Sequence, residues 1–287
     1  MDLVMHSYSL RNYSLEHVFA AAAHYGFDGV EVSTWHLDLR DDPDAVAGEL
    51  ARADALARRH GVRLHCVGYE GDFVADDPDR RRHSIALVSR IVSECAAIGV
   101  GLVNGFGGWL QDDPDDWLNN GSARAGDEHY ARCADAYREV GVAAAREGVR
   151  VAVEVHPNTV HDTVANTARL LDLLDHPAVV VTVDPANSAL ISPEDQDPDV
   201  LDQLGTRIAY LHIKNYVPAA GRADFSVDTA AGVIDNLRWL QKVAELGGVP
   251  AAALEYCGSG DPHPRLKAAH RYVRECEGLL DAIAGLR

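Results

Sequence analysis

Residues 150–184 read RVAVEVHPNTVHDTVANTARLLDLLDHPAVVVTVD, and this stretch decides the fold. Two short valine-rich runs, at 150–156 and 179–184, flank a segment at 164–174 in which leucine and alanine recur at helical spacing. Continuous apolar runs of this length are typical of strands that are buried on both faces of a parallel sheet. The stretch therefore predicts a strand–helix–strand unit whose two strands run parallel.

The same alternation of short apolar runs and long amphipathic segments continues along the whole chain of 287 residues. Eight such strand–helix pairs are expected, and eight is the number that closes a barrel, a fold that needs about 250 residues. The expected strands span residues 3–8, 29–33, 62–69, 101–106, 150–156, 179–184, 208–215 and 251–256, and the expected helices span 14–24, 44–60, 79–98, 127–147, 164–174, 199–204, 232–246 and 264–283.

An open, doubly wound sheet is the alternative α/β architecture, and it would carry a glycine-rich turn after the first strand. The sequence Tyr8-Ser9-Leu10-Arg11-Asn12 is no such turn. We therefore expect an α/β protein in which residues 1–287 form one domain, a single (β/α)8 TIM barrel. The long connection at about 107–126, between the fourth strand and the fourth helix, carries Trp109 and Trp117, and its length is typical of a lid or binding loop.

The composition bears on partners and compartment. A formal net charge of −18 disfavours nucleic-acid binding, which requires a basic face to neutralise phosphates. No apolar run approaches the length of a membrane span, and residues 1–6 lack the basic region of a signal peptide. Five cysteines, far apart and without a C-x-x-C pair, favour reduced thiols over disulfides or a cysteine zinc site. We expect a cytoplasmic protein with no membrane partner.

Polar residues close four consecutive strands of the second half of the chain, and in a barrel the strand ends form the active site. These residues are Glu154, Asp184, His212 and Glu255. Carboxylates at the ends of valine-rich strands are costly unless a cation compensates them, and like charges this close would not all stay ionised. The four residues therefore predict a site for one divalent metal ion. Mixed oxygen and nitrogen ligands suit Mn²⁺, which we expect first, and also Mg²⁺, Co²⁺ or Zn²⁺.

This ligand set resembles the single-metal site of the sugar isomerase/epimerase superfamily, whose members are xylose isomerase-like TIM barrels. Three short segments also resemble sequence motifs that are usual in that family: 6–10 (HSYSL), 26–31 (GFDGVE) and 211–214 (LHIK). The similarity runs over essentially the whole chain. The resemblance implies a metal-dependent isomerase or epimerase that acts on a keto-sugar, an inosose or a related polyol through a metal-stabilised enediolate. It also implies that Glu154 and Glu255 both bind the metal and exchange protons with the substrate from opposite faces.

Some residues depart from the plainest epimerase pattern. Family epimerases often carry a histidine where this chain has Asn187, and Lys214 stands near the place where an arginine is common. His156 has the same strand parity as Glu154, so it is expected beside the metal as a further acid or base. A Glu-x-His sequence here also resembles the metal-bearing subunit of C-glycoside deglycosidases, lyase-type enzymes that work with a small second subunit. Sugar dehydration is a third outcome of the same enolising chemistry.

Four residues are expected to contact a sugar, polyol or glycoside substrate: Asn187, Lys214, His6 and Trp109. Glu31, also at a strand end, is a weaker candidate for the pocket lining, and Trp35 and Phe106 are candidates for an apolar wall. An AP endonuclease shares the barrel but needs more histidines to bind three zinc ions. Asn104 occupies a position where such an enzyme would need a histidine ligand. A non-catalytic metabolite-binding barrel is the remaining class. Oligomeric state stays open between a homo-oligomer and a complex with a small accessory subunit.

Overall fold

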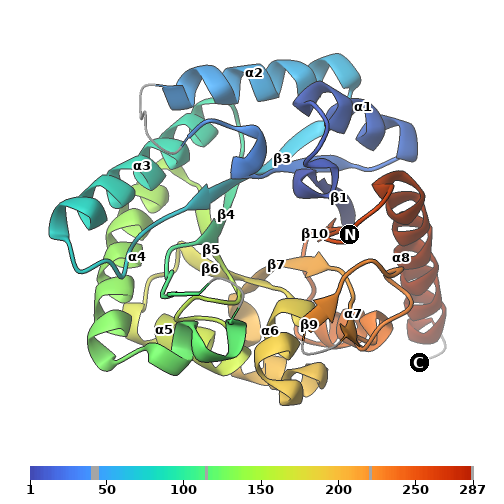
Figure 1. The fold of residues 1–287 in the computed structure, drawn as a ribbon. Coiled ribbons are helices and arrows are strands. Elements are labelled where there is room, and N and C mark those ends of the chain that lie inside the picture. The colour runs from blue at the N-terminus through green and yellow to red at the C-terminus, as the bar shows by residue number, and fades with distance from the viewer. Residues whose placement is uncertain (40–44, 114–115, 220–221, 286–287) are drawn as a thin grey trace.

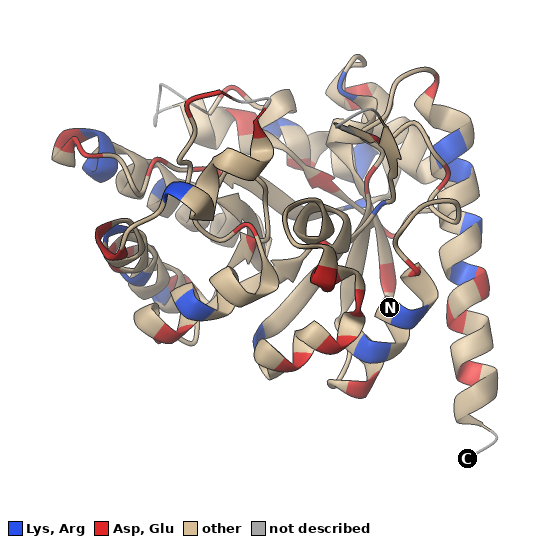
Figure 2. Cartoon of the chain, turned by 60° about the horizontal axis from the view of Figure 1, so that its bottom comes forward, with Lys and Arg blue, Asp and Glu red and all other residues tan. Residues whose placement is uncertain are grey.

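A computed structural model of the chain describes residues 1–39, 45–113, 116–219 and 222–285. Eight parallel strands form a closed barrel in which the first strand pairs with the last. Figure 1 shows the helices as a ring around these strands, and Figure 2 shows acidic and basic residues side by side along the outer helices. The expected (β/α)8 barrel is confirmed. The barrel strands are β1 (Asp2–His6), β2 (Gly29–Val32), β3 (Arg63–Glu70), β4 (Leu102–Phe106), β5 (Arg150–Glu154), β6 (Val179–Val183), β7 (Ile208–Ile213) and β10 (Ala251–Leu254).

Local signals set the ends of the helices. Ser14 accepts a hydrogen bond from the backbone of His17 at the start of the first helix, and Gly26 ends that helix in the left-handed conformation, which costs glycine little. The outer helices are α1 (Leu15–Tyr25), α2 (Ala45–His60), α3 (Pro78–Ala97), α4 (Asp127–Glu147), α5 (Val164–Leu174), α6 (Pro185–Ile191), α7 (Asn236–Glu245) and α8 (Pro262–Ala284). None of the helices in the described residues is long and apolar enough to cross a membrane.

The segment after β6 differs from expectation. The helix expected at 199–204 is a 3-10 helix at Pro198–Gln203, and the α-helix of this unit is α6, directly after the strand. Asp184 caps α6 by accepting a hydrogen bond from the backbone of Asn187, and Pro185 occupies its first turn. Since proline is favoured at the start of a helix, this short segment could have been found from its capping residues.

Two further differences concern the β7–α7 connection. The helix expected from 232 begins only at Asn236, because Asp235 acts as its N-cap. An antiparallel hairpin of β8 (Val217–Ala219) and β9 (Arg222–Asp224) precedes it, which the sequence pattern does not predict. Strands of three residues are too short to show a period-two alternation.

Alternation along each strand divides the buried residues into two sets. One set packs strands against helices, as Leu3, Met5, Val151 and Val153 do. The other set consists of strand residues alone and fills the inside of the barrel. Its members are Val4, Cys66, Leu102, Ala152, Val180, Ala209, Tyr210, Ala251 and Ala253. The adjacent pair Ala209 and Tyr210 departs from the alternation where the pairing of β6 with β7 shifts register. Because side chains two positions apart face the same way, the residue two positions after an inward one enters the mouth of the barrel.

One glycine sits where β3 and β4 come close. A Cβ atom on Gly105 would lie 2.0 Å from the backbone oxygen of Tyr69. We expect Gly105→Ala to lower the free energy of unfolding by about 1–3 kcal/mol or more, because the two strands must move apart. Gly48, on α2, has nothing within 4 Å of such an atom. Gly48→Ala should instead raise stability by about 0.5–1 kcal/mol. Urea unfolding followed by circular dichroism measures both, and equal effects would contradict the strand-contact argument.

Candidate metal centre and substrate pocket

Six barrel strands place a polar side chain at the mouth, each two positions after an inward-facing residue or glycine. Buried acidic and imidazole groups therefore face one another across the barrel. The residues, in chain order, are His6, Glu31, Asn104, Glu154, His212 and Glu255, and Asp184 joins them directly after β6.

Glu154, Asp184 and His212 form a group that we call the metal triad. One ligand atom of each lies within 4.8 Å of the others. The His212 Nδ1 atom is 3.4 Å from Glu154 Oε1 and 3.8 Å from Asp184 Oδ2. This Nδ1 atom is buried with no hydrogen-bond partner among the described residues, whereas Asp184 Oδ2, also buried, lies 2.8 Å from the Lys214 ammonium. An unpartnered buried imidazole nitrogen that faces two buried carboxylates fits a bound cation.

Charge at the triad also fits a cation. Burial raises the pKa of Asp184, and the nearby Lys214 ammonium and His212 imidazole only partly oppose this effect. Burial alone would likewise raise the pKa of Glu154, but His212 holds it below its usual range. A divalent ion at the triad would supply the positive charge that these buried carboxylates lack.

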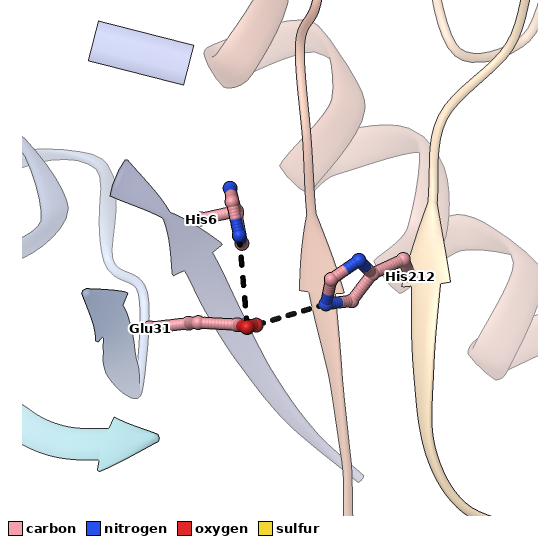
Figure 3. Close-up of side chains that lie close together, drawn as sticks. All are labelled: His6, Glu31 and His212. Carbon is pink, nitrogen blue, oxygen red and sulfur yellow. Dashed lines mark hydrogen bonds and ion pairs between the residues drawn. The ribbon is translucent and has the colours of Figure 1, made fainter. Parts of the chain in front are cut away.

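Glu31 holds the other side of the His212 ring. Its Oε2 atom lies 2.9 Å from His212 Nε2, and its Oε1 atom accepts a hydrogen bond of 2.8 Å from Asn104. Figure 3 shows His6 and His212 directed at the Glu31 carboxylate from different strands. Burial opposes ionisation of Glu31, but His212 and His6 lower its pKa to about 2. Burial opposes protonation of His212, but Glu31 and Glu154 raise its pKa well above the usual value. With Nε2–H donating to Glu31, a bound cation would replace the proton on Nδ1, which faces the triad.

The role of Glu31 and Asn104 at the centre goes beyond the sequence prediction, which made Glu31 only a pocket-lining candidate. Both residues lie two positions after an inward-facing position of their strands, as Glu154 and His212 do, so this parity signal was present on β2 and β4 as well. His6, Glu31 and His212 make a second group in which one ligand atom of each residue lies within 4.8 Å of the others. In this group, however, Glu31 is already paired with His212 and Asn104.

Glu255, the fourth expected ligand, is turned toward Lys214. Its Oε2 atom is 2.6 Å from the Lys214 ammonium and its Oε1 atom is 3.3 Å from His6 Nδ1. The same ammonium lies 2.8 Å from Asp184 Oδ2. Burial favours the neutral amine, but Asp184 and Glu255 hold the pKa of Lys214 well above its usual value. Lys214 thus bridges Asp184 and Glu255, and its ammonium would be displaced from at least one carboxylate if both bound a metal.

A pocket of about 470 Å³ opens above these groups. His6, Lys214, Asn187 and Trp109, the four expected substrate contacts, all line it. The Asn187 amide donates to Glu154 Oε1 at 3.3 Å and to the backbone oxygen of Val155 at 3.1 Å. Asn187 therefore fixes the Glu154 carboxylate as well as lining the pocket.

His156 also lines the pocket, but its ring belongs to an aromatic cluster. It stacks on Phe106 with ring centroids 4.1 Å apart, and Trp109 lies edge-on to both rings. The His156 Nδ1 atom is 2.8 Å from the backbone oxygen of Pro157. This contact directs the Nδ1 proton to the backbone and leaves Nε2 as the nitrogen available to a substrate.

Comparison with known proteins identifies the family. The model of the xylose isomerase-like TIM barrel family matches residues 19–276. The chain belongs to this family. The resemblance expected from the sequence is therefore confirmed. Among the curated proteins, none matches the chain.

Solved structures with this fold include enzymes of several activities. The L-ribulose 3-epimerase superposes with a TM-score of 0.75 at 17% identity and covers 99% of this chain and 97% of its own. The 3-keto-D-glucoside 4-epimerase YcjR from E. coli gives 0.73 at 18% identity, with 96% and 100% covered. The probable 3-DHS dehydratase AsbF from Bacillus anthracis gives 0.72 at 21% identity, with 96% and 99% covered. At these identities the likeness establishes the fold, and the chemistry must be argued from the site.

The pairing of Glu31 with His212 can be tested through metal affinity. Glu31→Gln should weaken Mn²⁺ binding by about 10–100-fold, because the partner that orients the imidazole and increases its basicity is replaced by a neutral amide. Isothermal titration of metal-free protein measures the change. Glu70→Gln removes another carboxylate of the same pocket and should have a much smaller effect. Equal affinities of the Glu31 variant and the unmodified protein would contradict the assignment.

Proposed function

We propose that this protein is a divalent-metal-dependent isomerase or epimerase of a keto-sugar, an inosose or a related polyol. The observation that carries the proposal is the metal triad, Glu154, Asp184 and His212, whose buried ligand atoms lie within 4.8 Å of one another at the pocket that Glu154 lines. Mn²⁺ is the first candidate, with Mg²⁺, Co²⁺ and Zn²⁺ as alternatives, because the ligands are oxygen and nitrogen atoms without a thiolate.

The chemistry follows from the positions of the carboxylates. A divalent ion bound to a carbonyl and its neighbouring hydroxyl acidifies the C–H bond between them. Glu154 and Glu255 come from strands separated by β6 and β7, so they reach the pocket from different sides. One carboxylate can remove the proton from one face of the carbon while the other, once protonated, returns a proton to the opposite face. Lys214 and His6 hold Glu255 in place for this step.

Exchange of the substrate C–H proton with solvent tests the reaction class directly. We expect the Mn²⁺-loaded protein, incubated in D₂O with a panel of ketohexoses and inososes, to incorporate one deuterium into at least one of them, as measured by mass spectrometry. Treatment with EDTA should abolish incorporation, and added Mn²⁺ should restore it, because the metal-free carboxylates cannot acidify the C–H bond. Absence of stoichiometric metal together with absence of any EDTA-sensitive exchange would overturn the proposal and revive a non-catalytic barrel.

A lyase reaction is the second candidate function, and His156 is the residue that favours it. Its Nε2 atom is available at the pocket, where it could protonate a leaving group after the C–H proton has been removed. Loss of water or cleavage of a glycoside would change the product mass, whereas isomerisation would not. His156→Gln separates the two candidates, since it should abolish elimination and spare deuterium exchange.

A further inference from the structure

The pocket has an excess of negative charge. Glu31, Glu70, Glu154 and Glu255 line it, and Asp184 lies directly behind. In the described part of the chain, the lining holds a single lysine, Lys214, and no arginine. That lysine already pairs with two of the carboxylates. Even a bound divalent ion would leave the carboxylates in excess, and a phosphate would bring a further charge of about −1.5 to −2.

Anionic groups are usually bound by arginine, by lysine or by the start of a helix. The helix that begins at this site, α6, has only seven residues, and the Asp184 carboxylate already accepts from its first turn. Among the described residues, the pocket lining therefore offers a phosphate or carboxylate no arginine and no unpaired lysine. These features favour an uncharged ligand.

A preformed apolar surface lies on one side of the same pocket. We call Phe106, Trp109 and His156 the aromatic wall, since their rings contact one another with centroids 4.1–5.4 Å apart. Trp109 forms an antiparallel bridge with Thr159, and the adjacent Leu110 donates to the backbone of Asn158 at 2.9 Å. The segments after β4 and β5 thus hold each other in place, and the wall does not need a ligand to assemble it.

The pocket volume also exceeds what the metal chemistry alone requires. About 470 Å³ falls within the range of roughly 300–1,000 Å³ that is typical of sites enclosing drug-sized ligands. Glu31 and Glu154 contact Asn104, which lies two positions deeper on β4 than Phe106 of the aromatic wall, whereas Glu70 is level with Phe106. A ligand that fills the space has a polar sugar part and an apolar part.

On the basis of the proposed function, we propose that the substrate is an uncharged sugar that carries a planar apolar substituent, with the sugar at the carboxylates and the substituent against Phe106, Trp109 and His156. Contacts between the substituent and these rings would contribute binding free energy beyond that of the buried apolar area. We expect the resulting gain in affinity to be about tenfold. The aromatic wall would then select the substituent, and the carboxylates would exclude sugar phosphates.

Two matched ligand pairs test the proposal by isothermal titration of the Mn²⁺-loaded protein. Phenyl β-D-glucoside should bind about tenfold more tightly than methyl β-D-glucoside. D-fructose should bind at least as tightly as D-fructose 6-phosphate. Trp109→Ala should reduce the phenyl preference several-fold, and Trp109→Phe should keep most of it. Equal binding of the two glucosides, tighter binding of the phosphate, or no detectable binding of phenyl glucoside at millimolar concentration would each overturn the proposal.

A pair of variants tests whether the carboxylates of the pocket exclude sugar phosphates. Glu70→Gln should raise the affinity for D-fructose 6-phosphate relative to D-fructose several-fold, whereas Asp135→Asn, on the exposed surface of α4, should leave the ratio unchanged. Equal effects of the two variants would overturn this part. If the protein exchanges deuterium into ketoses but shows none of these ligand preferences, this inference alone is overturned. If the protein shows these ligand preferences but exchanges deuterium into no ketose, the proposed function is overturned instead.

Discussion

Replacing Glu154 by glutamine should reduce deuterium exchange into the ketose substrate by about 10³-fold or more. The variant loses a proton acceptor, an effect typically of about 10²–10⁴-fold, and it also loses one charge of the metal triad. The Glu154 carboxylate accepts from the side-chain amides of Asn104 and Asn187 at 3.3 Å each. In the variant, the NH₂ group of the glutamine would face the NH₂ group of Asn104 or Asn187. Because both groups are hydrogen-bond donors, the side chain at position 154 would also be displaced. Initial rates at saturating Mn²⁺ measure the loss.

Glu255→Gln is the informative companion, because Glu255 lies outside the metal triad and is held by Lys214 and His6. We expect a comparable loss of turnover with substantial retention of metal, as measured by elemental analysis of the purified variant. Glu139→Gln makes the same chemical change on the exposed surface of α4 and should be active. Full activity of either the Glu154 or the Glu255 variant would contradict their assignment as the proton-transferring pair.

The sequence predicts the barrel well because the interior of each strand imposes a pattern that can be read along the chain. In residues 150–154 the alternate positions Ala152 and Glu154 face inward, and this parity carries over to the mouth. The 3-10 helix at Pro198–Gln203 and the hairpin of β8 and β9 were not predicted correctly. Both elements are too short for periodicity to distinguish helix, strand and turn, so capping residues such as Asp184 and Pro185 are the better guide.

The contacts inside the site could not be derived in the same way. Strand parity shows that Glu31 and His212 both enter the mouth of the barrel, but they are 181 positions apart and lie on β2 and β7. Their pairing depends on the curvature of the closed barrel and on side-chain rotamers. The same limit applies to Lys214, which parity places beside His212 but which the structure places between Asp184 and Glu255. Parity therefore indicates which side chains reach the mouth of the barrel, but it does not indicate which of them pair with one another.

Lys214→Met should lower the free energy of unfolding of the metal-free protein by about 3–5 kcal/mol. The Lys214 side chain is only 6% exposed, and its removal leaves Asp184 and Glu255 as buried carboxylates without their cation. For a chain of this size the change corresponds to a fall in melting temperature of roughly 6–20 °C. Thermal unfolding in the presence of EDTA measures it.

The same substitution elsewhere separates burial from charge. Lys242 pairs with Asp199 and Asp202, whose side chains are 73% and 64% exposed, so Lys242→Met should cost less than about 1 kcal/mol. Mn²⁺ should stabilise the Lys214 variant more than the unmodified protein, because the ion can compensate Asp184 and Glu255 without displacing an ammonium group. Equal stabilisation by Mn²⁺ in both proteins would show that Lys214 and the metal do not share these carboxylates, and this result would contradict the assignment of both Asp184 and Glu255 as metal ligands.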